Sequence, residues 1–175
     1  LPVPRAVTGV PGLDEILYGG LPAGQMYLLE GGPGTGKTTI ALQFLLEGER
    51  RGERCLYVTL SESREELHAA GASHGWSLAG IPVVEFVPEE ASLSPENAYT
   101  VFHPSEVELT GTIQKLLVEI ERLNPERLVL DSLSEFRLMS GDAIRYRRQL
   151  LALKHYFAHR FTTALLLDDL TSEAH

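Results

Sequence analysis

The sequence has a single cysteine, Cys55, among its 175 residues. One thiol can form no internal disulfide and can supply no multi-cysteine zinc site, which favours a reducing compartment. Apolar runs near the roughly 18 residues that span a bilayer are missing, and the opening LPVPRAV lacks the charged and apolar parts of an export signal. These absences predict a cytoplasmic protein with no membrane partner.

Basic residues are also scarce relative to acidic ones. Fifteen Lys and Arg stand against 24 Asp and Glu, which gives a formal net charge of −9. The surface as a whole is therefore not that of a general nucleic-acid binder, although a local basic patch is compatible with it. Hydrophobic residues at 43% and charged residues at 22% exclude collagen-like, coiled-coil and wholly disordered chains.

Strand and helix signals alternate along the chain. Short apolar runs of buried-strand type occupy residues 26–30, 55–60, 83–87, 127–131 and 163–167. Amphipathic stretches with helix start and stop signals occupy residues 40–50, 63–74, 105–124 and 142–159, and Ser105 with Glu108 has the form of a capping box. Residues 88–104 are polar and punctuated by proline, so we expect a surface excursion there. The alternation predicts an α/β fold with a mostly parallel sheet and helices on both faces.

A glycine-rich loop follows the first predicted strand. Residues 31–38 read GGPGTGKT and satisfy the pattern G-x-x-x-x-G-K-[ST] between a strand and a helix. In such loops the backbone N–H groups surround phosphate oxygens, the lysine reaches the β- and γ-phosphates, and the hydroxyl after it binds Mg²⁺. The sequence therefore predicts an ATP and Mg²⁺ site, with Lys37 acting in catalysis and Thr38 as a metal ligand. The predicted nucleotide-binding residues are Gly32, Pro33, Gly34, Thr35, Gly36, Lys37, Thr38 and Thr39.

Carboxylates stand at the ends of the other predicted strands. Asp131 ends the run RLVLD, which is the form of the carboxylate that binds Mg²⁺ in P-loop enzymes. Hydrolysis also needs a carboxylate that orients the attacking water, and Glu62, just beyond a strand end, is the first candidate. Glu135, four residues after Asp131, is the rival candidate. Asp168 and Asp169 close the last strand at the same edge, either as a sensor of the γ-phosphate or as a strand-end cap.

A group of arginines has two interpretations. Arg145, Arg147 and Arg148 lie close together in the predicted helix 142–159. They could contact phosphate or a neighbouring subunit, but an exposed helix face that balances an acidic protein is the simpler interpretation.

The residues around the loop resemble a known family. Residues 8–39 read TGVPGLDEILYGGLPAGQMYLLEGGPGTGKTT, which is similar to the opening signature of the RecA-like ATPases of the KaiC and RadA group. The matching positions are Thr8-Gly9, Leu13-Asp14, Gly19-Gly20-Leu21 and Gly24. RadA proteins usually carry a four-cysteine zinc module ahead of this point. Because no such module is present, the sequence is identified as KaiC-like.

This resemblance implies a RecA-like P-loop NTPase core over residues 1–175 as a single domain. Such domains continue with further strands, so we expect this one to be incomplete at its C-terminus, with the last strands missing and turnover poor. The chain also begins without an initiator methionine. Where the family has two glutamates that polarise water, this sequence has Ser61 and Glu62.

The resemblance also carries expectations about function. It implies an ATPase that binds Mg·ATP between the subunits of a homo-oligomeric ring, in hexameric form, and drives conformational change in a signalling assembly with partner proteins. A RadA-like DNA recombination or repair motor is the alternative, and the net charge weighs against it. A nucleotide-gated interaction module with little turnover is the third possibility.

Overall fold

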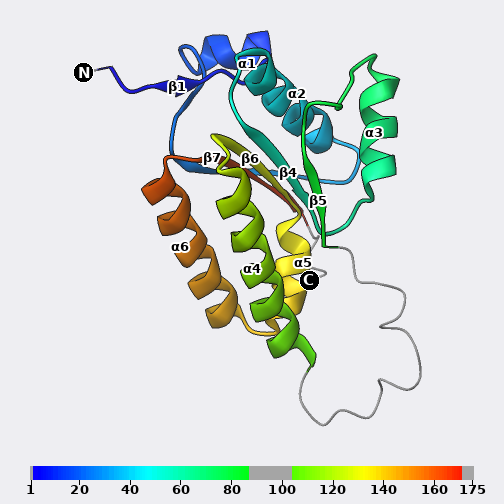
Figure 1. The fold of residues 1–175 in the computed structure, drawn as a ribbon, viewed down its shortest axis with the longest axis vertical. Helices are drawn as coiled ribbons and strands as arrows, with labels where there is room; N and C mark the ends of the chain where they lie inside the picture. The colour runs from blue at the N-terminus through cyan, green and yellow to red at the C-terminus, as the bar shows by residue number, and fades with distance from the viewer. Residues whose placement is uncertain (1, 87–103, 171–175) are drawn as a thin grey trace.

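The computed structural model describes residues 2–86 and 104–170, arranged as a sheet between two layers of helices (Figure 1). Its elements are, in chain order, β1 (Arg5–Ala6), α1 (Pro11–Ile16), β2 (Leu21–Pro22), β3 (Met26–Gly31), α2 (Lys37–Arg50), β4 (Cys55–Thr59), α3 (Arg64–Ser73), β5 (Val83–Glu85), α4 (Pro104–Leu123), β6 (Arg127–Asp131), α5 (Leu133–Ser140), α6 (Ala143–Arg160) and β7 (Thr163–Asp169).

The main sheet has five strands in the order β3-β7-β6-β4-β5, and every neighbouring pair is parallel. The chain leaves β3, crosses to β4 and β5, and returns through β6 and β7 to the side of β3. This arrangement confirms the predicted α/β fold. It also brings the carboxyl ends of β3, β7, β6 and β4 to one edge, where open α/β sheets bind their ligands.

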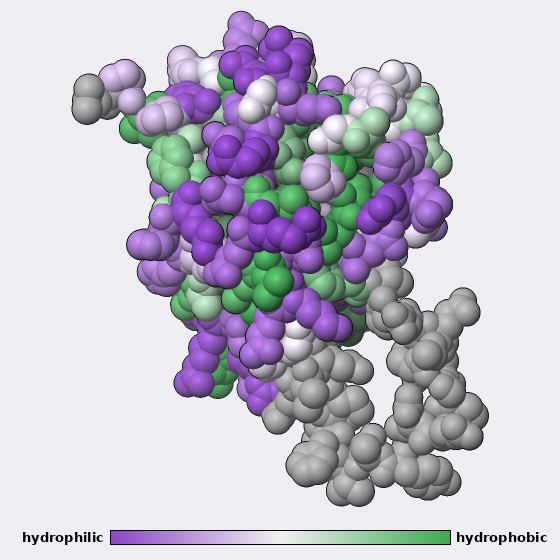
Figure 2. All heavy atoms as spheres, in the orientation of Figure 1, coloured by the Kyte–Doolittle hydropathy of each residue, from purple (hydrophilic) through white to green (hydrophobic). Residues whose placement is uncertain are grey.

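Helices cover both faces of the sheet because each presents an apolar stripe to it. On one face α2 and α3 bury side chains against the strands, among them Phe44, Leu45 and Leu67. On the other face α4, α5 and α6 do the same, with residues such as Ile120 and Phe157. The outer side of α4 and α6 is largely hydrophilic (Figure 2). Within the described ranges, no helix combines the length and the apolar character needed to cross a membrane.

The N-terminal segment was not predicted as regular structure, yet it forms α1 and a two-stranded antiparallel sheet of β1 and β2. Asp14 accepts hydrogen bonds from the backbone N–H groups of Thr8 (2.7 Å) and Gly9 (3.1 Å). Gly20 lies against β1 with a φ of +114°, where a Cβ would stand 2.3 Å from the Ala6 carbonyl oxygen. Several residues of the family-like signature therefore shape this segment.

Several predicted boundaries are corrected by the structure. The helix predicted at 40–50 begins earlier, at Lys37, and the last strand continues to Asp169. The strand predicted at 83–87 ends at Glu85. α5, which directly follows β6, was not predicted at all.

The region before α4 falls partly outside the described residues. Of the predicted surface excursion at 88–104, only Pro104 is described, as the first residue of α4. Ser105 therefore lies inside the helix instead of capping it, and the side-chain bonds of the predicted capping box lie outside the described residues. A difference of one residue is ordinary for a helix boundary.

Candidate functional site

The glycine-rich loop connects the end of β3 to the first turn of α2. Gly36 is the N-cap of α2 with a φ of +93°, and Gly34 has a φ of +75°. Both lie in the left-handed region that glycine adopts without strain. The first N–H groups of a helix have no partner within it, so the start of α2 offers donors and the positive end of the helix dipole to an anion.

Lys37 is the first residue of α2, and its ammonium group points back over the loop. Its Nζ donates hydrogen bonds to the carbonyl oxygens of Gly31 (2.8 Å) and Gly32 (2.9 Å). It also forms an ion pair with Asp169, with 2.9 Å between Nζ and Oδ1. The lysine is therefore held at the mouth of the loop by backbone oxygens and a carboxylate.

The two carboxylates at the end of β7 face opposite sides of the sheet, because side chains alternate along a strand. Asp169 faces the glycine-rich loop and contacts Lys37. Asp168 is buried on the other face, where it accepts a hydrogen bond from Ser134 Oγ (3.0 Å) and pairs with Arg137 of α5. Of the two aspartates, Asp169 is therefore the one that lies beside the glycine-rich loop.

Asp131, at the end of β6, is buried next to a tyrosine of the neighbouring strand. The phenol of Tyr57 in β4 donates a 2.7 Å hydrogen bond to Asp131 Oδ2. Burial raises the pKa of the Asp131 carboxyl, and the hydrogen bond from Tyr57 lowers it in part. Burial, followed by the nearby Asp131 charge, raises the pKa of Tyr57 well above its usual value.

Glu62 lies in a tight turn just after β4. The Thr59 hydroxyl donates to the carbonyl oxygen of Glu62 (2.8 Å) and accepts from its N–H (2.9 Å). The next residue, Ser63, begins a capping box with Glu66 that starts α3. Burial, and then the charge of Asp131, raises the pKa of the half-buried Glu62 carboxyl. Its backbone is therefore fixed, and its carboxyl lies within electrostatic range of Asp131.

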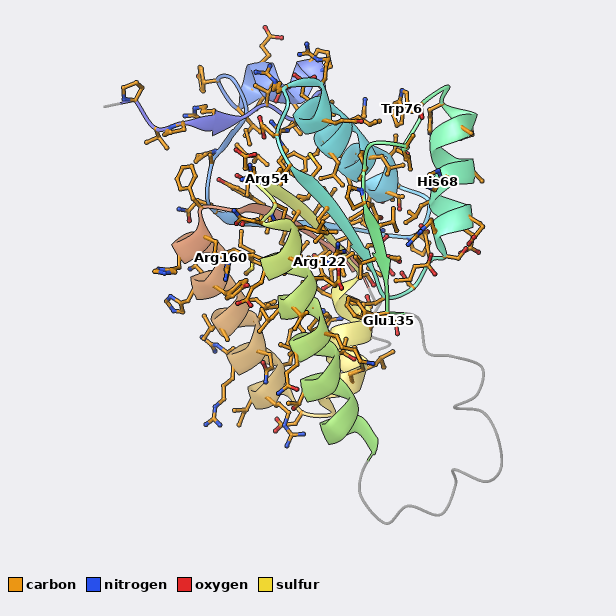
Figure 3. The ribbon with its side chains drawn as sticks, in the orientation of Figure 1. Arg54, His68, Trp76, Arg122, Glu135 and Arg160 are labelled. Carbon is orange, nitrogen blue, oxygen red and sulfur yellow. The ribbon has the colours of Figure 1, made fainter. Side chains whose placement is uncertain are left out.

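Glu135, the rival candidate to Glu62, lies in the first turn of α5 (Figure 3). This helix starts directly after the end of β6, close to Asp131 in the sequence.

Thr38 and Asp131 supply hydroxyl and carboxylate oxygens, the hard ligands that Mg²⁺ prefers. Thr38 also lies close enough to the Tyr57 phenol to lower its pKa. The donor chemistry present therefore fits the metal that the glycine-rich loop implies.

Two features of this site have no signal in the sequence. Tyr57 lies within the apolar run of β4 and has the pattern of an ordinary core residue. Its contact with Asp131 depends on the pairing of β4 with β6, which are separated by almost seventy residues of chain. The Lys37–Asp169 pair depends in the same way on β7 lying beside β3.

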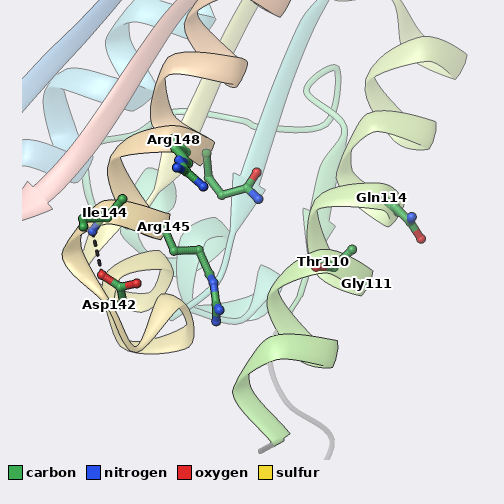
Figure 4. A pocket seen from close by; sticks show the side chains of 8 residues that line it. Thr110, Gly111, Gln114, Asp142, Ile144, Arg145 and Arg148 are labelled. Carbon is green, nitrogen blue, oxygen red and sulfur yellow. Dashed lines mark hydrogen bonds between the residues drawn. The ribbon is translucent and has the colours of Figure 1, made fainter.

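The arginines of α6 lie apart from this site. Arg145 and Arg148 line a cavity of about 770 Å³ between α4 and α6, together with polar residues such as Gln114 (Figure 4). None of the predicted nucleotide, metal or catalytic residues lines that cavity.

Comparison with known proteins gives one consistent answer. A family model described as "ATPase: KaiC" matches residues 6–175. A UPF0273 protein of Aeropyrum pernix is 32% identical over 176 residues, covering 97% of this chain and 69% of the relative. The circadian clock oscillator protein KaiC of Parathermosynechococcus lividus is 30% identical over 173 residues, covering 98% of this chain and 31% of that protein. The crystal structure of a KaiC-like protein from Pyrococcus horikoshii superposes with a TM-score of 0.77 at 30% identity, covering 98% of this chain and 73% of that one.

Proposed function

Because the chain belongs to the KaiC family of ATPases, we propose that it binds ATP with Mg²⁺ and hydrolyses it. The observation that carries this proposal is the convergence of three side chains at one edge of the sheet: Lys37 at the start of α2, Asp131 at the end of β6 and Glu62 just after β4. We place this activity in a homo-oligomeric ring that acts as a nucleotide-driven switch in a signalling assembly, by analogy with the KaiC relatives.

Binding follows from the loop and from the start of α2. The N–H groups of residues 34–39 and the Lys37 ammonium would surround the β- and γ-phosphates. Asp169 must give up its ion pair when Lys37 turns to a phosphate. Thr38 and Asp131 would hold Mg²⁺, which neutralises charge on the phosphate oxygens when it is bound.

Hydrolysis needs a group that orients water against the γ-phosphate. Glu62 has a fixed backbone and a half-buried carboxyl whose pKa is raised, and both properties suit a group that accepts a proton from water. Its neighbour is Ser61, so a single carboxylate would do this work. Lys37 would stabilise the charge that develops on the phosphoryl group as it is transferred from ADP to water.

The experiment is an ATP titration of the Lys37→Ala protein, with exposed Lys154→Ala in α6 as the matched control. Charge-assisted hydrogen bonds contribute about 1.5–3 kcal/mol each, so we expect affinity to fall about ten- to a hundredfold for Lys37→Ala and to stay level for Lys154→Ala. Equal affinity in the two variants would overturn the proposal.

Two further measurements on the same protein test the proposed role. Stimulation of ATP turnover by single-stranded DNA would favour the RadA-like alternative. A particle mass that does not change when Mg·ATP is added would argue against a ring that assembles with nucleotide.

A further inference from the structure

We infer that Tyr57 is a positioning residue for magnesium: its phenol orients the Asp131 carboxylate beside Thr38 and thereby sets how tightly Mg²⁺ is held with ATP. The inference rests on the proposed function, since it concerns the same site. It adds a residue that supports the metal ligands without touching the nucleotide.

Sheet register explains how Tyr57 reaches Asp131. β4 and β6 are parallel neighbours, with Tyr57 opposite Val129 and Thr59 opposite Asp131. Tyr57 and Asp131 therefore face the same side of the sheet and are diagonal neighbours, a separation that an aromatic side chain can span. The resulting hydrogen bond is 2.7 Å long between the phenol oxygen and Oδ2.

The hydrogen bond between Tyr57 and Asp131 is buried. Tyr57 is 0% exposed and Asp131 is 7% exposed, so water has little access to the bond between them. Within the described part of the chain, the Tyr57 phenol is the side-chain donor to the Asp131 carboxylate. A buried carboxylate that loses its donor is free to rotate, and rotation removes a well-placed oxygen from a metal.

The phenol also lies close to the second metal ligand. Thr38, in the first turn of α2, lies close enough to the Tyr57 hydroxyl to lower the pKa of the phenol. The Tyr57 phenol thus donates to one of the groups that would hold Mg²⁺ and lies near the other, although the two come from elements far apart in sequence.

The test is Tyr57→Phe, which removes one oxygen atom and keeps the ring. Binding of a fluorescent ATP analogue is measured at increasing Mg²⁺ concentrations and, separately, in EDTA. Supporting groups behind metal ligands typically contribute about 10- to 100-fold to metal affinity, so we expect the Mg²⁺ midpoint to rise about tenfold. Affinity in EDTA should stay at the wild-type value.

Tyr27→Phe is the matched control, because Tyr27 donates its own 2.7 Å hydrogen bond to the Pro22 carbonyl oxygen, away from the site. It should leave the Mg²⁺ midpoint unchanged. Asp131→Asn supplies a second test: if Tyr57 acts through Asp131, adding Tyr57→Phe to that variant should cause no further shift. Should Tyr57→Phe unfold in buffer, the titrations are run in sucrose, which favours the folded state.

The Mg²⁺ dependence of ATP binding in the Tyr57→Phe protein decides the inference. A wild-type Mg²⁺ midpoint in the Tyr57→Phe protein overturns the inference, and so does an equal loss of affinity with and without Mg²⁺, which would mark a purely structural role. If the wild-type protein itself binds no ATP, the proposed function falls, and this inference falls with it. A Mg²⁺-specific loss in Tyr57→Phe, absent from Tyr27→Phe, supports it.

Discussion

At the scale of single residues, Asp168 and Asp169 at the end of β7 are adjacent in the sequence but have different partners. Asp168 turns to the face covered by α5, where Arg137 and Ser134 satisfy it in a buried setting. Asp169 turns to the other face and contacts Lys37. The Asp168 carboxylate ties α5 to the sheet, and the Asp169 carboxylate faces the glycine-rich loop.

The first residue-scale prediction separates the two candidates for orienting water. Glu62→Gln keeps the size of the side chain and removes its charge, so kcat should fall about 10²- to 10⁴-fold while ATP affinity stays nearly level. Glu135→Gln should change little. Steady-state ATPase rates and nucleotide titrations on both variants check this, and the reverse pattern would make Glu135 the group that acts on water.

A second residue-scale prediction concerns the cost of the buried Asp131. Burial raises its pKa in the folded protein above the ordinary 3.8, so ionisation of this carboxyl favours unfolding once the pH exceeds both values. Asp131→Asn still accepts the Tyr57 hydrogen bond and should therefore raise the unfolding midpoint of the nucleotide-free protein at neutral pH. The gain should disappear as the pH falls below 3.8, where the carboxyl is protonated in both states.

Thermal unfolding followed by circular dichroism at both pH values provides the measurement. Asp142→Asn is a fitting comparison, because Asp142 is exposed and caps α6 through a bond to the Ile144 N–H that asparagine also accepts. It should move the midpoint little at either pH. A midpoint lowered at neutral pH by Asp131→Asn would show that its ionised form stabilises the fold.

At the scale of elements, the family-like signature is mostly a set of backbone requirements. Asp14 ties the start of α1 to Thr8 and Gly9. Gly24 has a φ of +73°, and its N–H donates to Thr163 Oγ1 at the start of β7 (2.9 Å). Gly20 lets β2 approach β1. These residues shape the segment that leads into β3, and through it they position the glycine-rich loop.

The element-scale prediction is that Gly20→Ala destabilises this N-terminal segment. A Cβ would stand 2.3 Å from the Ala6 carbonyl oxygen, at a φ of +114° that alanine rarely adopts. Strain and overpacking together should lower the free energy of unfolding by about 3 kcal/mol, or about 6–12 °C in midpoint. Gly12→Ala in α1, where a Cβ meets nothing within 4 Å, should be neutral or slightly stabilising. Equal midpoints in the two variants would contradict the close approach.

At the scale of the whole molecule, sequence patterns predicted the sheet well because its strands are apolar runs bounded by turns. The same patterns missed α5, because this helix is short and follows β6 after a single residue, so the sequence shows no separate helical periodicity there. They placed the loop, Asp131 and Glu62 at strand ends, since those signals are local. The partners of these residues could not be predicted, because Tyr57 and Asp169 meet them only through strand order.

The ion pair between Lys37 and Asp169 gives the protein a built-in competitor for its own ligand. A phosphate that binds Lys37 must first displace the Asp169 carboxylate from it. When the nucleotide dissociates, the same carboxylate can pair with Lys37 again. The measured affinity for nucleotide is then lower than the intrinsic affinity of the loop by the free energy of this ion pair. Asp169→Asn should therefore tighten nucleotide binding up to about fivefold in an equilibrium titration, whereas weaker binding would mean that Asp169 helps to hold the bound state.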